Sequence, residues 1–280
     1  MSNTISNINT TNQICNVQAK SKEKEIQHNI ENTQIEQNKS QVYYGKDLVQ
    51  TQNNTKIDND LAALFQDLKG KDGKDFAETA YKGLVKYFGL NDVAPKSLSW
   101  EQSEGRPIVS DYRWYENKVV LYEDYFNKAP KEKQIGYIAH ELTHLKQTTN
   151  ILKTEGLPLE NYAVAIAVSD FKAMMTRNPQ MQNAYKTASL NGKGKEFSTY
   201  MIQKGAAQTY KELNTVFADV LKQPKHPLNS PEGQKAVNDV KAQAMYNGAD
   251  LNAYNNCPLE KEAMDIENSI RLAYRQTQNK

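Results

Sequence analysis

Cysteine and histidine are scarce in this chain. The two cysteines, Cys15 and Cys257, lie far apart, and the 280 residues include only four histidines. Two isolated cysteines form neither a disulfide framework nor a C-x-x-C metal site. Because histidines are so few, a pattern that uses two of them is informative.

Long apolar runs and an excess of charge of one sign are also missing. No apolar stretch is long enough to span a membrane, and the N-terminus lacks the basic and apolar regions of a secretory signal. The 35 basic and 33 acidic residues leave a net charge of +2, which argues for neither nucleic acid nor a membrane as a partner. We therefore expect a cytoplasmic protein, with non-classical secretion through a polar N-terminus left open. The oligomeric state is not indicated.

The mean hydropathy of −0.79 is low for a globular enzyme. Residues 1–56 are dominated by Asn, Gln, Ser, Thr, Lys and Glu, without a sustained apolar period. Such a segment buries too little apolar surface to offset the entropy of the chain, which predicts a disordered tail. Cys15 and His28 lie in this tail, and we interpret Cys15 as an ordinary thiol, because no motif surrounds it. The folded part is predicted to span residues 57–280.

The segment His140-Glu141-Leu-Thr-His144 matches the H-E-x-x-H pattern of zinc proteases. Residues four apart lie on one face of a helix, so His140 and His144 can direct two imidazole nitrogens at one Zn²⁺. Glu141 sits beside that face, where its carboxylate can take a proton from a metal-activated water. The preceding Pro130 suits the first turn of a helix. Apolar residues also follow at helical spacing, at Ile135, Ile138, Leu142 and Leu145.

Strand-like sequence precedes this helix and helical sequence follows it. β-branched and aromatic residues predict a small sheet from residues 97–102, 108–115 and 118–122. An extended peptide could add to the edge of such a sheet, although the sheet could equally serve only to support the helix. The helices predicted after residue 150 are 157–175, 197–221, one starting at Ser230, and 255–275.

We therefore predict an α+β fold that is mainly helical, with a small sheet next to the H-E-x-x-H helix. Residues 57–150 are expected to hold two helices, the sheet and the motif helix. Residues 151–280 are expected to form a helical part that carries the third metal ligand.

A catalytic zinc site usually has three protein ligands and one position for water. Asn150 stands where metzincins have a third histidine, and His226 lies between two prolines in a polar break. The segment Pro258-Leu-Glu260-Lys-Glu-Ala263 resembles the gluzincin branch of zincin metallopeptidases, in which the third ligand is a Glu in an E-x-x-A context on a later helix. Gln147, three residues after the second histidine, adds to the likeness.

The resemblance implies that His140, His144 and Glu260 bind zinc and that Glu141 is the general base. The acid that several gluzincins have directly after the alanine is displaced by one residue here, to Asp265. Two further acids therefore stay open as alternative ligands or as groups that orient a histidine, namely Glu262 and Asp265.

Helical periodicity alone does not choose Glu260: Glu260 and Glu262 flank the apolar face of their helix on opposite sides, and Glu262 lies somewhat nearer to it. The register of the motif favours Glu260. Glu155 and Glu160 rank below both, since neither has an E-x-x-A context.

The sequence thus predicts a zinc-dependent metallopeptidase that acts on a protein or peptide substrate, with Zn²⁺ as cofactor. A tyrosine can stabilise the oxyanion, and the candidates are Tyr254, Tyr112 and Tyr115. Two alternatives stay open. One is a mainly helical interaction protein with a structural or vestigial zincin site, and the other is a delivered effector with a narrow target.

Overall fold

The computed structural model describes residues 59–248 and 250–278. The predictions for the polar tail of residues 1–56, with Cys15 and His28, lie outside the described residues. Within the described part, none of the helices combines the length and the apolar character needed to cross a membrane.

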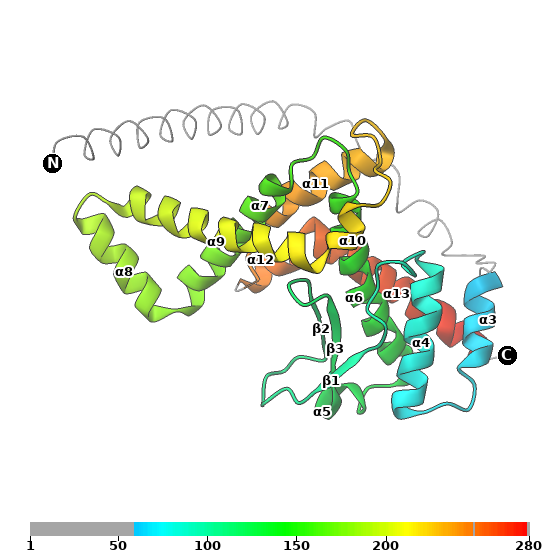
Figure 1. Cartoon of the computed structure of the whole chain (residues 1–280). Helices are drawn as coiled ribbons and strands as arrows, with labels where there is room; N and C mark the ends of the chain where they lie inside the picture. Colours follow the sequence, from blue (N-terminus) through cyan, green and yellow to red (C-terminus); the bar gives the residue numbers. More distant parts are fainter. Residues whose placement is uncertain (1–58, 249, 279–280) are drawn as a thin grey trace. The chain divides into compact units, whose positions relative to one another are not determined.

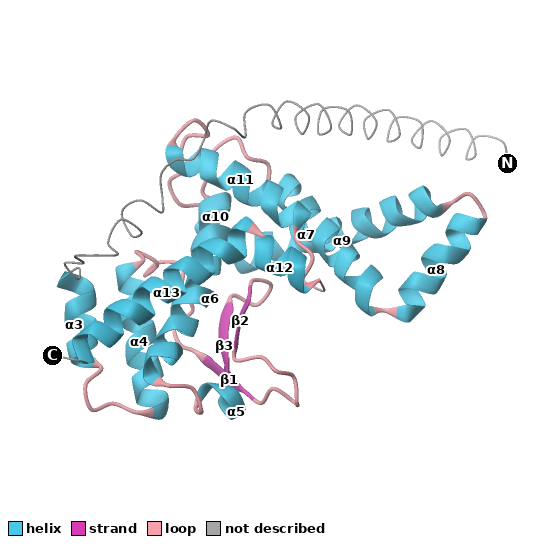
Figure 2. Ribbon diagram, turned by 180° about the vertical axis from the view of Figure 1, so that it is seen from behind, coloured by secondary structure: helices cyan, strands magenta, loops and turns pink. Residues whose placement is uncertain are grey.

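The fold is α+β and mainly helical, as predicted (Figure 1). The helix α6 carries the H-E-x-x-H motif and lies between the small sheet and α13 (Figure 2). The elements in chain order are α3 (Asn59–Asp67), α4 (Gly73–Tyr87), β1 (Ser99–Glu101), β2 (Ser110–Arg113), β3 (Lys118–Tyr122), α5 (Glu123–Phe126), α6 (Lys131–Leu152), α7 (Leu159–Arg177), α8 (Pro179–Leu190), α9 (Gly194–Val216), α10 (Ala218–Leu221), α11 (Pro231–Met245), α12 (Leu251–Asn256) and α13 (Pro258–Gln278).

The sheet has the order β1-β3-β2, so β3 is central. β1 runs parallel to β3, and β2 runs antiparallel to it with Ser110 opposite Leu121. The predicted turn between β2 and β3 contains Asn117 at φ 46°, a left-handed conformation that asparagine tolerates better than most residues. Because β3 is central, β2 is an edge strand, and it packs beside α6.

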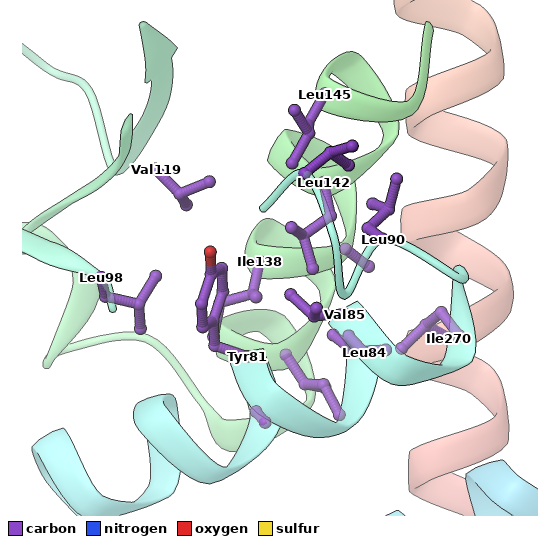
Figure 3. Close-up of a cluster of buried hydrophobic side chains, with 14 of the residues drawn as sticks. Tyr81, Leu84, Val85, Leu90, Leu98, Val119, Ile138, Leu142, Leu145 and Ile270 are labelled. Carbon is purple, nitrogen blue, oxygen red and sulfur yellow. The ribbon is translucent and has the colours of Figure 1, made fainter. Parts of the chain in front are cut away.

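A continuous apolar core surrounds α6. The four apolar residues predicted on one face of this helix are all fully buried, namely Ile135, Ile138, Leu142 and Leu145. Burying each such side chain stabilises the fold by roughly 1.5–3 kcal/mol. Figure 3 shows side chains of neighbouring elements in the same cluster, among them Tyr81, Leu84, Val119 and Ile270. The core thus fixes the rotation of α6 and leaves the flank with the motif histidines to face α13.

The helical part differs from the prediction in several places: α8 and α12 are not among the predicted helices, and the predicted helix over 197–221 is divided into α9 and α10. The pair Asn178-Pro179 is typical of the end of a helix, and α7 does end before it. The same pair also starts α8, since the side chain of Asn178 accepts a hydrogen bond from the backbone of Met181 at 3.1 Å and Pro179 occupies the first turn. The predicted helix over 255–275 is α13, and it begins only at Pro258, because Cys257 precedes a proline and is extended.

Candidate metal centre

The two motif histidines lie on the same flank of α6. His140 and His144 are one helical turn apart, and their Nε2 atoms lie 3.1 Å from each other. His140 is buried and His144 is half-buried. The i, i+4 spacing on a helix produces this pairing.

Glu260 brings a third ligand atom to the same point. It lies in the first turn of α13 and is buried, and its Oε2 is 3.5 Å from Nε2 of His140 and 3.5 Å from Nε2 of His144. A tetrahedral zinc ion with bonds of about 2.0–2.1 Å keeps its ligand atoms about 3.3 Å apart. The three observed separations therefore fit three corners of such a tetrahedron. Among the described residues, His140, His144 and Glu260 are the group of potential ligands close enough to hold one metal ion.

The converging atoms favour a positive charge between them. Oε2 of Glu260 is buried and has no hydrogen-bond partner among the described residues. Burial by itself lowers the pKa of His140, but the carboxylates of Glu260 and Glu267 outweigh it and raise that pKa to about 10. Burial alone would raise the pKa of Glu260, but the two histidines hold it well below its usual range. A cation at this point, either a proton or a metal, is therefore stabilised.

Gln147, also on α6, fixes the orientation of His144. The Nε2 group of Gln147 donates to the carbonyl oxygen of Leu259 at 3.1 Å and to Oε2 of Glu262 at 2.8 Å. Both partners only accept hydrogen bonds, so the amide oxygen of Gln147 faces Nδ1 of His144, at 2.9 Å. Nδ1 then carries the proton, and Nε2 presents a lone pair to the centre. Glu262 is thus engaged by Gln147 and is not one of the converging ligand atoms.

His140 is held from α13 as well. Oε2 of Glu267 lies 3.3 Å from Nδ1 of His140, an ion-pair contact outside hydrogen-bond geometry, and its charge stands on the side of the ring opposite to Nε2. The two helices approach closely because residue 136 is a glycine. A Cβ atom at Gly136 would stand 2.5 Å from Cγ of Arg271 and 3.0 Å from Cγ of Glu267. The small residue therefore makes room for the acid beside His140.

Asp265, one of the two acids left open as an alternative ligand or as a group that orients a histidine, does not lie at the centre. Asp265 is exposed, because five residues past Glu260 correspond to about 140° of rotation around a helix. Glu267, seven residues past Glu260, returns to the same face of α13. Sequence reasoning missed Glu267, although this seven-residue spacing was a signal that could have found it.

The acids and the histidine that ranked lower lie elsewhere. Glu155 and Glu160 are exposed. The backbone N–H of His226 donates to the carbonyl of Lys153 at 2.6 Å, and the N–H of Glu155 donates to the carbonyl of His226 at 2.8 Å. The backbone of His226 therefore hydrogen-bonds the loop before α11 to the residues that follow α6.

Glu141 is buried beside the two histidines. Oγ of Ser110, on the edge strand β2, donates to Oε1 of Glu141 at 2.7 Å. Burial raises the pKa of Glu141, while the two histidines and the Ser110 hydrogen bond act in the opposite direction. Sequence reasoning missed Ser110, because a single serine in a strand carries no pattern.

Two tyrosines border Glu260. Tyr254 of α12 and Tyr246, which follows α11, are half-buried and have ring centroids 6.2 Å apart. Burial, and then the negative charge of Glu260, raise the pKa of both phenols, so both remain hydrogen-bond donors at neutral pH. Tyr246 was not among the predicted tyrosines. Of the others, Tyr112 packs against the apolar core and Tyr115 is 46% exposed.

Comparison with known proteins adds no relative. No protein-family profile, no curated protein sequence and no solved structure matches the chain.

Proposed function

We propose that this protein is a zinc-dependent metallopeptidase in which His140, His144 and Glu260 bind the metal and Glu141 is the general base. The observation that carries the proposal is the convergence of three ligand atoms at separations of 3.1–3.5 Å. A buried carboxylate, Glu141, lies directly beside this point.

The donor set favours zinc in a catalytic rather than a structural site. Two imidazole nitrogens and one carboxylate oxygen suit zinc, and structural zinc sites normally use four protein ligands. In the part of the chain that the structure describes, no fourth His, Cys, Asp or Glu joins the three. A position for water or substrate thus remains in a tetrahedral arrangement.

Each side chain has a defined task in this proposal. Zinc, when bound, supplies the positive charge that acidifies water and polarises a carbonyl group. Glu141 takes the proton from water and passes it to the leaving amine, and its burial raises its pKa toward the range that suits both steps. Ser110 holds one oxygen of that carboxylate in place. The phenol of Tyr254 is the proposed donor to the oxyanion.

The edge strand β2 supports a peptide as the substrate. The N–H of Tyr122 donates to the carbonyl of Val109 at 3.0 Å, so Val109 directs its backbone toward β3. In an antiparallel pair the next residues alternate, so Ser110 and Tyr112 direct their N–H and C=O groups toward the free edge. An extended peptide can pair with such an edge. Because Ser110 also contacts Glu141, a peptide bound there would lie next to the general base.

The experiment combines elemental analysis with cleavage of a peptide library by the full chain. We expect one zinc per chain in the wild type and in Asp265→Ala, which changes an exposed acid of the same helix, and loss of zinc in Glu260→Ala. Glu141→Gln should keep its zinc while its cleavage rate falls by about 10²–10⁴-fold. If Glu141→Gln cleaves as fast as the wild type, the assignment of the base is wrong. If the wild type holds zinc and cleaves no peptide, the metal is structural and the interaction-protein alternative replaces the peptidase.

A further inference from the structure

A half-buried cluster of charges lies on the Nδ1 side of His144, away from the converging ligand atoms. Nζ of Lys235, on α11, is 2.7 Å from Oδ2 of Asp239 and 2.7 Å from Oε2 of Glu262. The same oxygen of Glu262 accepts the hydrogen bond from Gln147 at 2.8 Å. A continuous chain of contacts therefore runs from α11 through Glu262 and Gln147 to the ring of His144.

In this series of contacts, the chemistry of each group fixes which partner donates the hydrogen bond and which accepts it. A lysine ammonium group only donates and a carboxylate only accepts. With Lys235 donating to it, Glu262 receives the NH₂ group of Gln147 as well, and the amide oxygen of Gln147 is left for Nδ1 of His144.

Lys235 is suited to maintain these donor and acceptor roles because its ammonium group stays charged. Its side chain is only 23% exposed, and burial by itself lowers its pKa. Asp239 and Glu262 outweigh burial and raise that pKa above its ordinary value. Asp239 is itself buried, so the lysine is held by two acids and not by solvent. An unpaired charge at this depth would be costly, and this disfavours other arrangements of the cluster.

We propose that Lys235 is a positioning residue of the metal centre, which fixes the amide of Gln147 through Glu262 and thereby keeps the lone pair of His144 directed at the metal. The inference rests on the proposed zinc site and adds a role for α11. This helix lies between the two ligand-bearing helices in the sequence and contributes no ligand of its own.

The test measures the zinc dissociation constant of the full chain by competition with a chelator, and the melting temperature of the zinc-free protein. Lys235→Met should weaken zinc binding by about 10–100-fold, the range typical of groups that orient a metal ligand. Lys235→Arg keeps a charged donor and should bind within about threefold of the wild type. The matched control is Lys222→Met, which breaks an ion pair with Asp219 whose side chains are 75% and 93% exposed, and it should leave zinc affinity unchanged.

An exchange of the two interacting side chains separates positioning from general damage to the fold. Gln147→Glu alone places two carboxylates against each other and should weaken zinc binding by about tenfold or more. The double variant Gln147→Glu with Glu262→Gln restores an acceptor for His144 and a donor toward residue 147. It should regain most of the lost affinity, although the contact to the carbonyl of Leu259 is not restored. A merely structural role for the cluster does not produce this rescue.

The outcomes distinguish this inference from the proposed function. Unchanged zinc affinity in Lys235→Met, or a double variant no better than Gln147→Glu, overturns the positioning role and leaves the metal site intact. A fall in melting temperature with unchanged zinc affinity overturns it as well. Zinc binding that follows the expected order without any peptide cleavage upholds Lys235 and overturns the peptidase. Failure of the wild type to bind zinc overturns both.

Discussion

The affinity for zinc should rise steeply with pH, through and beyond neutrality. In the proposed site zinc would bind the neutral form of His140, whereas the carboxylates of Glu260 and Glu267 raise the pKa of that ring to about 10 in the metal-free protein, against the opposing effect of burial. Below this pKa each zinc ion must displace a proton. Apparent affinity should therefore increase about tenfold per pH unit up to about pH 10, whereas a histidine with the ordinary pKa of about 6.5 gives no further increase above about pH 7.5.

The size of the effect follows from the same pKa. At pH 7.5 a group with a pKa of about 10 is neutral in about one molecule in 300, so proton displacement weakens zinc binding about 300-fold, or about 3 kcal/mol. At pH 8.5 the factor is about 30. Zinc binding should also release about one proton at pH 7.5 from His140 alone, and more if His144, whose pKa is also raised, is protonated.

The assay is chelator competition at pH 6.5, 7.5 and 8.5 at constant ionic strength, corrected for protonation of the chelator. Glu267→Gln removes one of the carboxylates that raise the pKa of His140, so the dependence above pH 7.5 should become shallower. Glu132→Gln, at the start of α6 and 3.8 Å from Arg275, is the matched control and should keep the wild-type slope. An affinity in the wild type that is constant between pH 7.5 and 8.5 would refute the reasoning.

Three further predictions concern the support of the site and the core. Ser110→Ala should keep zinc but move the acidic limb of the pH–rate profile to higher pH. In the wild type the hydrogen bond from Ser110 lowers the pKa of Glu141, so its removal raises that pKa; a profile that superimposes on the wild type contradicts this. Gly136→Ala should weaken zinc binding by about tenfold, because its Cβ displaces Arg271 and the acid beside it; elemental analysis at limiting zinc measures it. Phe65→Ala, at a fully buried position, should lower the free energy of unfolding by about 3–5 kcal/mol in urea denaturation, and a loss under 1 kcal/mol would show that the cavity collapses.

The parts of this molecule that follow from local periodicity were predictable. The pairing of His140 with His144 needs only 3.6 residues per turn, and the burial of one face of α6 needs only the apolar spacing around it. The antiparallel β2 and β3 follow from strand-forming residues on either side of a turn that includes Asn117.

The third ligand could not be derived from periodicity. Glu260 and Glu262 flank the same apolar face of α13. The acid that lies next to the histidines is decided by the position along α6 at which the first turn of α13 crosses that helix. That crossing is set by contacts such as the close approach at Gly136, where a distant arginine packs onto a glycine. Such pairings between residues far apart in the chain leave no local pattern, and for the same reason Ser110 was missed.

The placement of the ligands on α6 and α13 divides the centre between two widely separated stretches of chain. A single proteolytic cut in the exposed turn at Gly192, between α8 and α9, would leave both histidines on one fragment and Glu260 with its neighbouring acids on the other. Neither fragment alone would hold a complete set of ligands. Recovery of zinc binding on mixing the two fragments would report their reassembly, and the metal would then link two separate polypeptides.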